Sequence, residues 1–216
     1  MAQGQKIESL ESFTAFFGVS RETAERLRVY HGLLLKWQPA VQLVAPKTLA
    51  EAWHRHFADS AQIVKLGPAV PKTWVDLGSG GGFPGLVVAI LLAETGTKVT
   101  LIESDRRKCT FLREVARSCG IAVDIVTDRI ETAANTASVR SADVVSARAL
   151  APLPELLDLA APLFGPETIG LFMKGRDAGK EVEVAKQRWA FDHRLIESLT
   201  EPEARIVEVR GLKRRS

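Results

Sequence analysis

A glycine-rich stretch, "VDLGSGGGFPG" at residues 75–85, constrains the fold of this chain more than any other feature. Five of its eleven residues are glycine, and one carboxylate, Asp76, stands near its start. The stretch follows the β-rich run "TWVDL" (73–77) and precedes the apolar, helix-length run "GLVVAILLAE" (85–94). A bare loop between a strand and a helix is typical of a cofactor site at the carboxyl end of a parallel sheet.

Strand-like and helix-like segments alternate after this loop. Further β-rich runs lie at 98–103, 122–126, 142–147 and 168–174, with helix-length segments between them. A last pair, around 192–198 and 205–209, is too close for a crossover helix and predicts an antiparallel hairpin. We therefore expect an α/β fold with a doubly wound, mostly parallel, seven-stranded, Rossmann-like sheet over residues 71–216.

Residues 1–70 show helical rather than strand periodicity. Apolar residues recur at three- and four-residue steps after Ser20, a suitable N-cap, and a further helix is expected over 51–66. This part of the chain is predicted to be a helical N-terminal extension of the main domain.

Composition excludes several classes of protein. The apolar share of 46% and the charged share of 25% are those of a globular protein, and no apolar run approaches the roughly 20 residues of a membrane-spanning helix. No secretory signal is visible, so we expect a cytoplasmic protein without membrane contact.

The spacing of Cys109 and Cys119 fits neither a zinc site nor a disulfide framework. Both ends of the chain carry a small excess of positive charge, which is compatible with a bound polyanion.

Two cofactor loops fit the glycine-rich stretch. Gly80, Gly82 and Gly85 satisfy the dinucleotide pattern GxGxxG, and Asp76, Gly78, Gly80 and Gly82 satisfy DxGxGxG, the loop of S-adenosylmethionine-dependent methyltransferases. A carboxylate before the first glycine suits a cationic sulfonium better than a pyrophosphate. Glu103, at the end of the next strand, can accept ribose hydroxyls of either cofactor. An NAD-dependent oxidoreductase therefore remains an alternative.

The methyl acceptor decides which catalytic residues are needed. Neither cysteine follows a proline, as the nucleophile of a pyrimidine carbon-5 enzyme commonly does, and the chain lacks the Asn/Asp-Pro-Pro-aromatic loop of amino methylation. The fourth predicted strand leads instead into "SARALAPL" (146–153), which carries Arg148. An acceptor with a free lone pair, such as guanine N7, needs only placement and charge complementarity. A methyltransferase acting on a protein or small molecule, or an RNA-binding module without activity, stays open.

Several motifs in this order resemble one family, the bacterial 16S ribosomal RNA guanine-N7 methyltransferases called RsmG, formerly GidB. They are "RHFADS" (55–60), "DLGSGGGFPG" (76–85), "LIESDRRKCTFL" (101–112), "RIE" (129–131), "SARALAPL" (146–153) and "MKG" (173–175). The resemblance implies a class I methyltransferase fold. It also implies S-adenosyl-L-methionine as cofactor, and 16S ribosomal RNA or the assembling small ribosomal subunit as partner. Which guanine is methylated, and on which form of the subunit, does not follow from it.

The resemblance also assigns roles to residues. It predicts cofactor contacts for Gly78, Phe83, Ile130, Glu131 and Arg148, to which the glycine-rich loop and the end of the next strand add Asp76, Gly80 and Glu103. Arg148 would lie between cofactor and target, paired with a cofactor carboxylate or an RNA phosphate, and Lys174 is a second catalytic candidate that would face the nucleotide. The family commonly has Asn-Leu-Thr where this chain has Gln42, Leu43 and Val44.

Candidate RNA contacts come from three segments of the chain. They are Arg55 and His56, Arg106 and Arg107, and Lys213 and Arg214. His54 and His56 lie on different faces of a helix, so we predict no metal site there. We expect instead an ion pair between Arg55 and Asp59, with His56 packed inward. A monomer is expected.

Overall fold

The computed structural model describes residues 6–134 and 141–215 and contains one seven-stranded sheet. The strand order is β3-β2-β1-β4-β5-β7-β6. The first five strands run parallel, and β7 lies antiparallel between β5 and β6. The strands are β1 Thr73–Leu77, β2 Lys98–Glu103, β3 Asp124–Thr127, β4 Val144–Arg148, β5 Ile169–Lys174, β6 Trp189–Glu197 and β7 Arg205–Arg214. The predicted mostly parallel sheet and its closing hairpin are confirmed.

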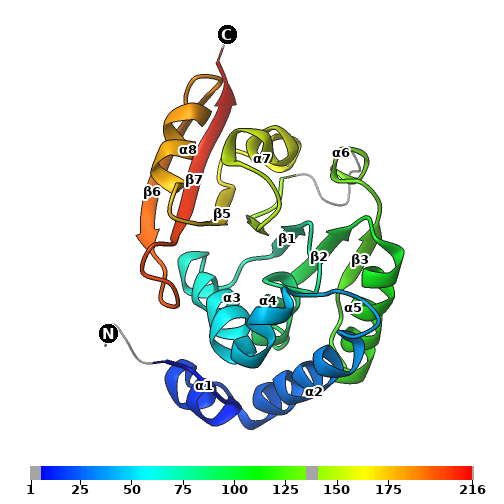
Figure 1. Cartoon of the computed structure of the whole chain (residues 1–216). Coiled ribbons are helices and arrows are strands. Elements are labelled where there is room, and N and C mark those ends of the chain that lie inside the picture. Colours follow the sequence, from blue (N-terminus) through cyan, green and yellow to red (C-terminus); the bar gives the residue numbers. More distant parts are fainter. Residues whose placement is uncertain (1–5, 135–140, 216) are drawn as a thin grey trace.

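Helices cover both faces of the sheet (Figure 1). One face carries α1 Leu10–Phe17, α2 Arg21–Trp37, α3 Asp59–Ala61, α4 Gly85–Leu91 and α5 Arg106–Cys119. The other carries α6 Ile130–Ala133, α7 Leu153–Ala160 and α8 Ala178–Ala185. Each face has its own apolar core.

Capping residues define the start of α2 and the end of α1. Ser20 caps α2 by accepting a hydrogen bond from the backbone N–H of Thr23, and Gly18 adopts a left-handed conformation at the end of α1. The apolar stripe of α2 packs against α4 and α5, so Leu27, Tyr30 and Leu34 are buried in the same core as the sheet. The N-terminal segment is thus one layer of the main domain.

The helix expected over 51–66 is not one regular helix. It is a series of short pieces: a 3₁₀-helix Pro46–Glu51, a π-helix Trp53–Ala58, α3 and a second 3₁₀-helix Gln62–Leu66. The α4 helix ends at Leu91, three residues before the expected end, and β6 and β7 are longer than predicted. The π-helix has a direct consequence for the functional site.

Candidate functional site

The carboxyl ends of β1, β2, β4 and β5 open into a cleft of about 790 Å³. This is the edge at which a doubly wound sheet normally binds its ligand. Three walls meet there: the glycine-rich loop, the N-terminal helical layer and the loop between β6 and β7. The lining includes Leu43, Val44, Arg55, His56, Asp59, Gly78, Gly80, Phe83, Glu103, Lys108, Ile130, Glu131, Arg148, Leu150, Lys174, Glu201 and Arg205. The cleft therefore brings together most of the residues predicted to bind a cofactor.

The glycine-rich loop follows a path that side chains would block. Gly78 and Gly82 have φ of 63° and 93°, in the left-handed region that glycine favours. A Cβ on Gly78 would come within 2.6 Å of a methyl carbon of Leu150, and one on Gly82 within 2.6 Å of the Tyr30 hydroxyl. The bare backbone is thus required by the neighbours of the loop as well as by its conformation.

Tyr30, which sequence reasoning did not single out, holds this loop from the helical layer. Its buried hydroxyl donates a hydrogen bond to the carbonyl oxygen of Gly81 at 2.5 Å, and its ring stacks on Phe83. The only signal in the sequence is a lone tyrosine on an apolar stripe, where its hydroxyl needs a partner. This contact ties α2 to the cleft.

Asp76 lies below the glycine-rich loop instead of in the cleft. This position corrects the prediction that its carboxylate lies beside the cofactor. Its side chain is fully buried, and it is not among the residues that line the cleft. One oxygen accepts from Ser146 Oγ at 2.7 Å, and the other from the backbone N–H of Gly85 at 3.2 Å. Burial raises the pKa of Asp76 to about 6, against these hydrogen bonds. Asp76 therefore fixes the loop and the start of α4.

Glu103 is placed as predicted, at the end of β2 and in the lining of the cleft. Its two oxygens accept backbone N–H groups of Gly80 and Asp105, each at 2.8 Å. A carboxylate has about four acceptor positions, so capacity remains for ligand hydroxyls. Glu103 thus couples the glycine-rich loop to a possible ribose site.

The π-helix builds a binding site for the guanidinium of Arg148. In an α-helix the Arg55 carbonyl would accept from Asp59, but here the backbone N–H of Asp59 bonds to the carbonyls of His54 and His56. The free Arg55 oxygen accepts from Arg148 Nη1 at 2.9 Å. Asp59 Oδ2 accepts from the same nitrogen at 3.1 Å, and the guanidinium carbon lies 5.4 Å from the ring centre of Phe83. Arg148 is therefore held rigidly at the end of β4.

His56 is packed inward, as expected, and its protonation follows from its partners. Arg148 Nη2 lies 2.8 Å from His56 Nδ1, and Thr48 Oγ1 lies 2.8 Å from Nε2. Because a guanidinium only donates, Nδ1 must accept and the ring proton sits on Nε2. Burial, followed by the charges of Arg148 and Arg55, lowers the pKa of His56 to about 3. His56 is therefore a neutral imidazole in the cleft wall.

The predicted ion pair between Arg55 and Asp59 is wrong. Asp59 pairs with Arg148, and Arg55 Nη1 reaches Glu201 Oε2 in the β6–β7 loop at 2.7 Å. The π-helix changes the geometry that a regular i,i+4 pair requires. Within residues 6–134 and 141–215, no group of three or more His, Cys, Asp or Glu side chains could hold a metal ion.

Lys174 lines the cleft at the end of β5 but already has two partners. Its ammonium donates to the carbonyl of Ala151 at 2.6 Å and lies 2.7 Å from Glu181 Oε2 on α8. The same carboxylate oxygen accepts from the backbone N–H of Leu153, at the start of α7. These contacts hold the turn in which Leu150 packs on Gly78.

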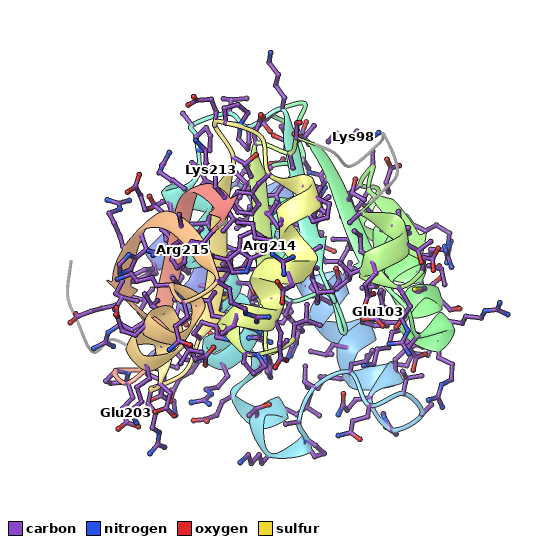
Figure 2. The ribbon with its side chains drawn as sticks, turned by 90° about the horizontal axis from the view of Figure 1, so that it is seen from above. Lys98, Glu103, Glu203, Lys213, Arg214 and Arg215 are labelled. Carbon is purple, nitrogen blue, oxygen red and sulfur yellow. The ribbon has the colours of Figure 1, made fainter. Side chains whose placement is uncertain are left out.

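The remaining predicted RNA contacts lie outside the cleft. Arg106 and Arg107 are exposed at the start of α5, where their neighbour Lys108 does line the cleft. Lys213 and Arg214 lie near the end of β7, which runs antiparallel to β5. Figure 2 shows Lys213 and Lys98 at one end of the sheet and Glu103 and Glu203 at the other. The structure therefore does not bring the C-terminal cations to the cleft.

The fold and the position of the cleft define a class of protein. A doubly wound sheet with an antiparallel β7 between β5 and β6 is the Rossmann-like fold of class I S-adenosylmethionine-dependent methyltransferases. Similar solved structures include the O-methyltransferase from Bacillus cereus in complex with SAH, with a TM-score of 0.56 and 14% identity over 93% of this chain and 99% of that chain. A ribosomal protein L11 methylase from Lactobacillus delbrueckii gives a TM-score of 0.55 with 15% identity, over 73% and 77% of the two chains. At these identities the likeness concerns the fold alone.

Sequence comparison identifies the family within that class. The family model described as rRNA small subunit methyltransferase G, or GidB, matches residues 23–207. A relative from Parvibaculum lavamentivorans, named Ribosomal RNA small subunit methyltransferase G, is 52% identical over 97% of this chain and 92% of its own length. The relative of the same name from Gluconobacter oxydans is 47% identical over 91% and 97% of the two chains. This chain belongs to the GidB family, which confirms the resemblance of its motifs. None of the described helices is long and apolar enough to cross a membrane.

Proposed function

We propose that this protein transfers a methyl group from S-adenosyl-L-methionine to N7 of one guanine in the 16S ribosomal RNA of the small ribosomal subunit. The names of its relatives support a small-subunit ribosomal RNA substrate. The finer choice of guanine N7 is supported by the chemistry of the cleft.

The cleft fits the proposed cofactor. Gly78 and Gly80 let the backbone approach a ligand closely, Glu103 offers acceptors for ribose hydroxyls, and Ile130 and Glu131 line the same cavity further along. When bound, S-adenosylmethionine would supply an electrophilic methyl group on a positively charged sulfur. The residues of this chain would then have to place the acceptor and exclude water.

The single observation that carries the choice of acceptor is that, among the residues that the structure describes, no free base or nucleophile lies beside Arg148. His56 is neutral with a pKa of about 3, and Asp59 is paired with Arg148. Both cysteines of the chain are buried, and burial raises the pKa of Cys119 to about 11. Guanine N7 carries its own lone pair in the ring plane, so methylation there needs no proton to be removed. Lys174 would help to place the nucleotide only indirectly, through the turn that it holds.

The proposal is tested by methylation in vitro. Purified protein and S-adenosylmethionine are incubated with 16S ribosomal RNA, an assembly intermediate and complete small subunits, all from a strain that lacks this activity. We expect 7-methylguanosine at one position in nucleoside mass spectrometry, on at least one of the three substrates. Its absence from all three would refute the proposal, and a different methylated nucleoside would refute the choice of N7.

A binding experiment separates the proposal from the oxidoreductase alternative. In calorimetric titration we expect S-adenosylhomocysteine to bind and NAD not to bind. Tight binding of NAD would favour the alternative.

A further inference from the structure

A half-exposed ion pair connects two walls of the cleft. Arg55 belongs to the π-helix Trp53–Ala58, and Glu201 belongs to the loop between β6 and β7, 146 positions further along the chain. The two side chains are 39% and 42% exposed, although their charged atoms are only 2.7 Å apart. Both residues line the cleft. The pair therefore occupies the place where a long substrate would enter.

The ion pair is not needed to hold the two elements together. Thr200, next to Glu201, donates its hydroxyl to Asp59 Oδ1 at 2.7 Å, and its carbonyl oxygen lies 3.1 Å from His54 Nε2. The backbone oxygen of Arg55 is separately held by Arg148. Exposed ion pairs add little to stability. The Arg55 guanidinium can therefore exchange its partner while the surrounding contacts stay in place.

We infer that Arg55 is the docking point for an RNA phosphate next to the target nucleotide, and that Glu201 occupies its guanidinium in the free protein. This inference rests on the proposed function. A planar guanidinium binds phosphate in the same two-pronged way as it binds a carboxylate, so an incoming phosphate can replace Glu201. The released carboxylate then lies close to the RNA and opposes binding. An RNA that makes few other contacts with the protein therefore binds weakly, because it has to displace Glu201 from Arg55.

A second ion pair involves the same loop, with a longer distance between its charged atoms. Glu203 lies 3.6 Å from Arg176, with side chains 64% and 72% exposed. Two carboxylates of the 198–204 loop thus partly neutralise Arg55 of the π-helix and Arg176, which follows β5. Of these two arginines, Arg55 lines the cleft and Arg176 does not, so we assign the docking role to Arg55.

The test measures RNA affinity of Glu201→Gln, which keeps the size of the side chain and removes its charge. The probe is a fluorescein-labelled, single-stranded RNA of mixed sequence, followed by anisotropy across a salt series. We expect the Kd near 0.1 M salt to fall about 3- to 10-fold, and the slope of log Kobs against log salt to steepen by up to about 0.7, as for one added phosphate contact. The matched control is Glu114→Gln on α5, which also removes a carboxylate from an exposed arginine, Arg117. This control is expected to leave the affinity nearly unchanged.

A double-mutant cycle shows whether the gain passes through Arg55. In an Arg55→Gln background, Glu201→Gln should lower the Kd much less than it does with Arg55 present, because only the repulsion between the carboxylate and the RNA is then removed. An equal gain without Arg55, or no gain in the single variant, would overturn the inference while leaving the proposed function intact. Absence of RNA binding by both the wild type and Glu201→Gln would overturn the inference, whereas only the methylation experiment described above can refute the proposed function. Equal thermal midpoints of all variants establish that the differences concern binding.

Discussion

The carboxyl group of Asp76 is a charge held inside the protein between β1 and the start of α4. Its folded pKa of about 6 lies above the ordinary value of 3.8, so the folded protein binds a proton between these values more tightly than the unfolded chain does. This group should therefore make the protein less stable as the pH rises from about 4 to about 7, by roughly 3 kcal/mol.

We predict that the carboxyl carbon resonance of Asp76 titrates near pH 6 in NMR spectra. The free energy of unfolding, measured in urea over the same pH range, should lose part of its pH dependence in Asp76→Asn. Asp105, a partly exposed N-cap whose pKa is lowered by backbone hydrogen bonds, serves as the reference resonance. A midpoint near 4 for Asp76 would contradict the prediction.

Arg148 carries the second prediction for a single residue. Its replacement by alanine leaves the largely buried carboxylate of Asp59 and the carbonyl of Arg55 without their cation. We expect Arg148→Ala to lower the free energy of unfolding by about 2–4 kcal/mol and to reduce methyl transfer strongly. Urea denaturation and a methylation assay measure the two effects. Arg28→Ala, which breaks an exposed pair with Glu25, should stay within about 0.5 kcal/mol of the wild type. Wild-type activity in Arg148→Ala would limit Arg148 to a structural role.

At the scale of elements, α8 supports the cleft from outside through Glu181. This carboxylate joins Lys174 on β5 to the first backbone N–H of α7. We expect Glu181→Ala to cost about 2 kcal/mol in the free energy of unfolding, because two partly buried donors lose their acceptor. Affinity for S-adenosylhomocysteine should fall with it, since the turn that packs Leu150 on Gly78 loosens.

Glu183→Ala is the matched control on the same helix. Glu183 is exposed and pairs with Lys186 in an i,i+3 arrangement, so its loss should cost less than about 0.5 kcal/mol. Chemical denaturation and calorimetry of the two variants provide the comparison. Equal effects would show that the link between α8, β5 and α7 does not support the cleft.

The elements show which features can be predicted from the sequence. The strand–loop–helix around 73–94 and the strands at 98–103 and 169–174 follow from local periodicity and turn residues, which act over a few positions. The carbonyl that the π-helix at Trp53–Ala58 leaves free is bound by Arg148, 93 positions away, and the contact of Tyr30 with the glycine-rich loop spans 51 positions. Such long-range partners leave no periodic signal, so the sequence predicts Asp59 as the partner of Arg55 instead of Glu201.

At the scale of the whole molecule, the helical layer and the sheet should unfold together. The apolar faces of α1 and α2 lie in one core with α4, α5 and one face of the sheet. We predict a single cooperative transition in which tryptophan fluorescence and far-UV circular dichroism coincide. The probes cover both parts, because Trp37 and Trp53 lie in the N-terminal segment and Trp74 and Trp189 in the strands.

Single-tryptophan variants sharpen this test. We consider one variant that keeps only Trp53 and one that keeps only Trp74. In each of them the unfolding midpoint measured by fluorescence should equal the midpoint measured by circular dichroism. Separate midpoints would mean that residues 1–70 form an independent folding unit. Calorimetry provides the second criterion, since the van't Hoff and calorimetric enthalpies agree only for one transition.

The place of β7 between β5 and β6 determines when this protein can fold during its synthesis. A nascent chain released only as far as β6 has the outer edge of β5 unpaired, and the strand that covers it is still inside the ribosome. The helices α1 and α2 emerge before α4 and α5, which cover their apolar faces and follow only with residues 85–119. The growing chain thus exposes apolar surface from its first helices onward and an open strand edge until its last strand is made. Nascent chains of this protein should therefore depend on chaperones for most of their translation.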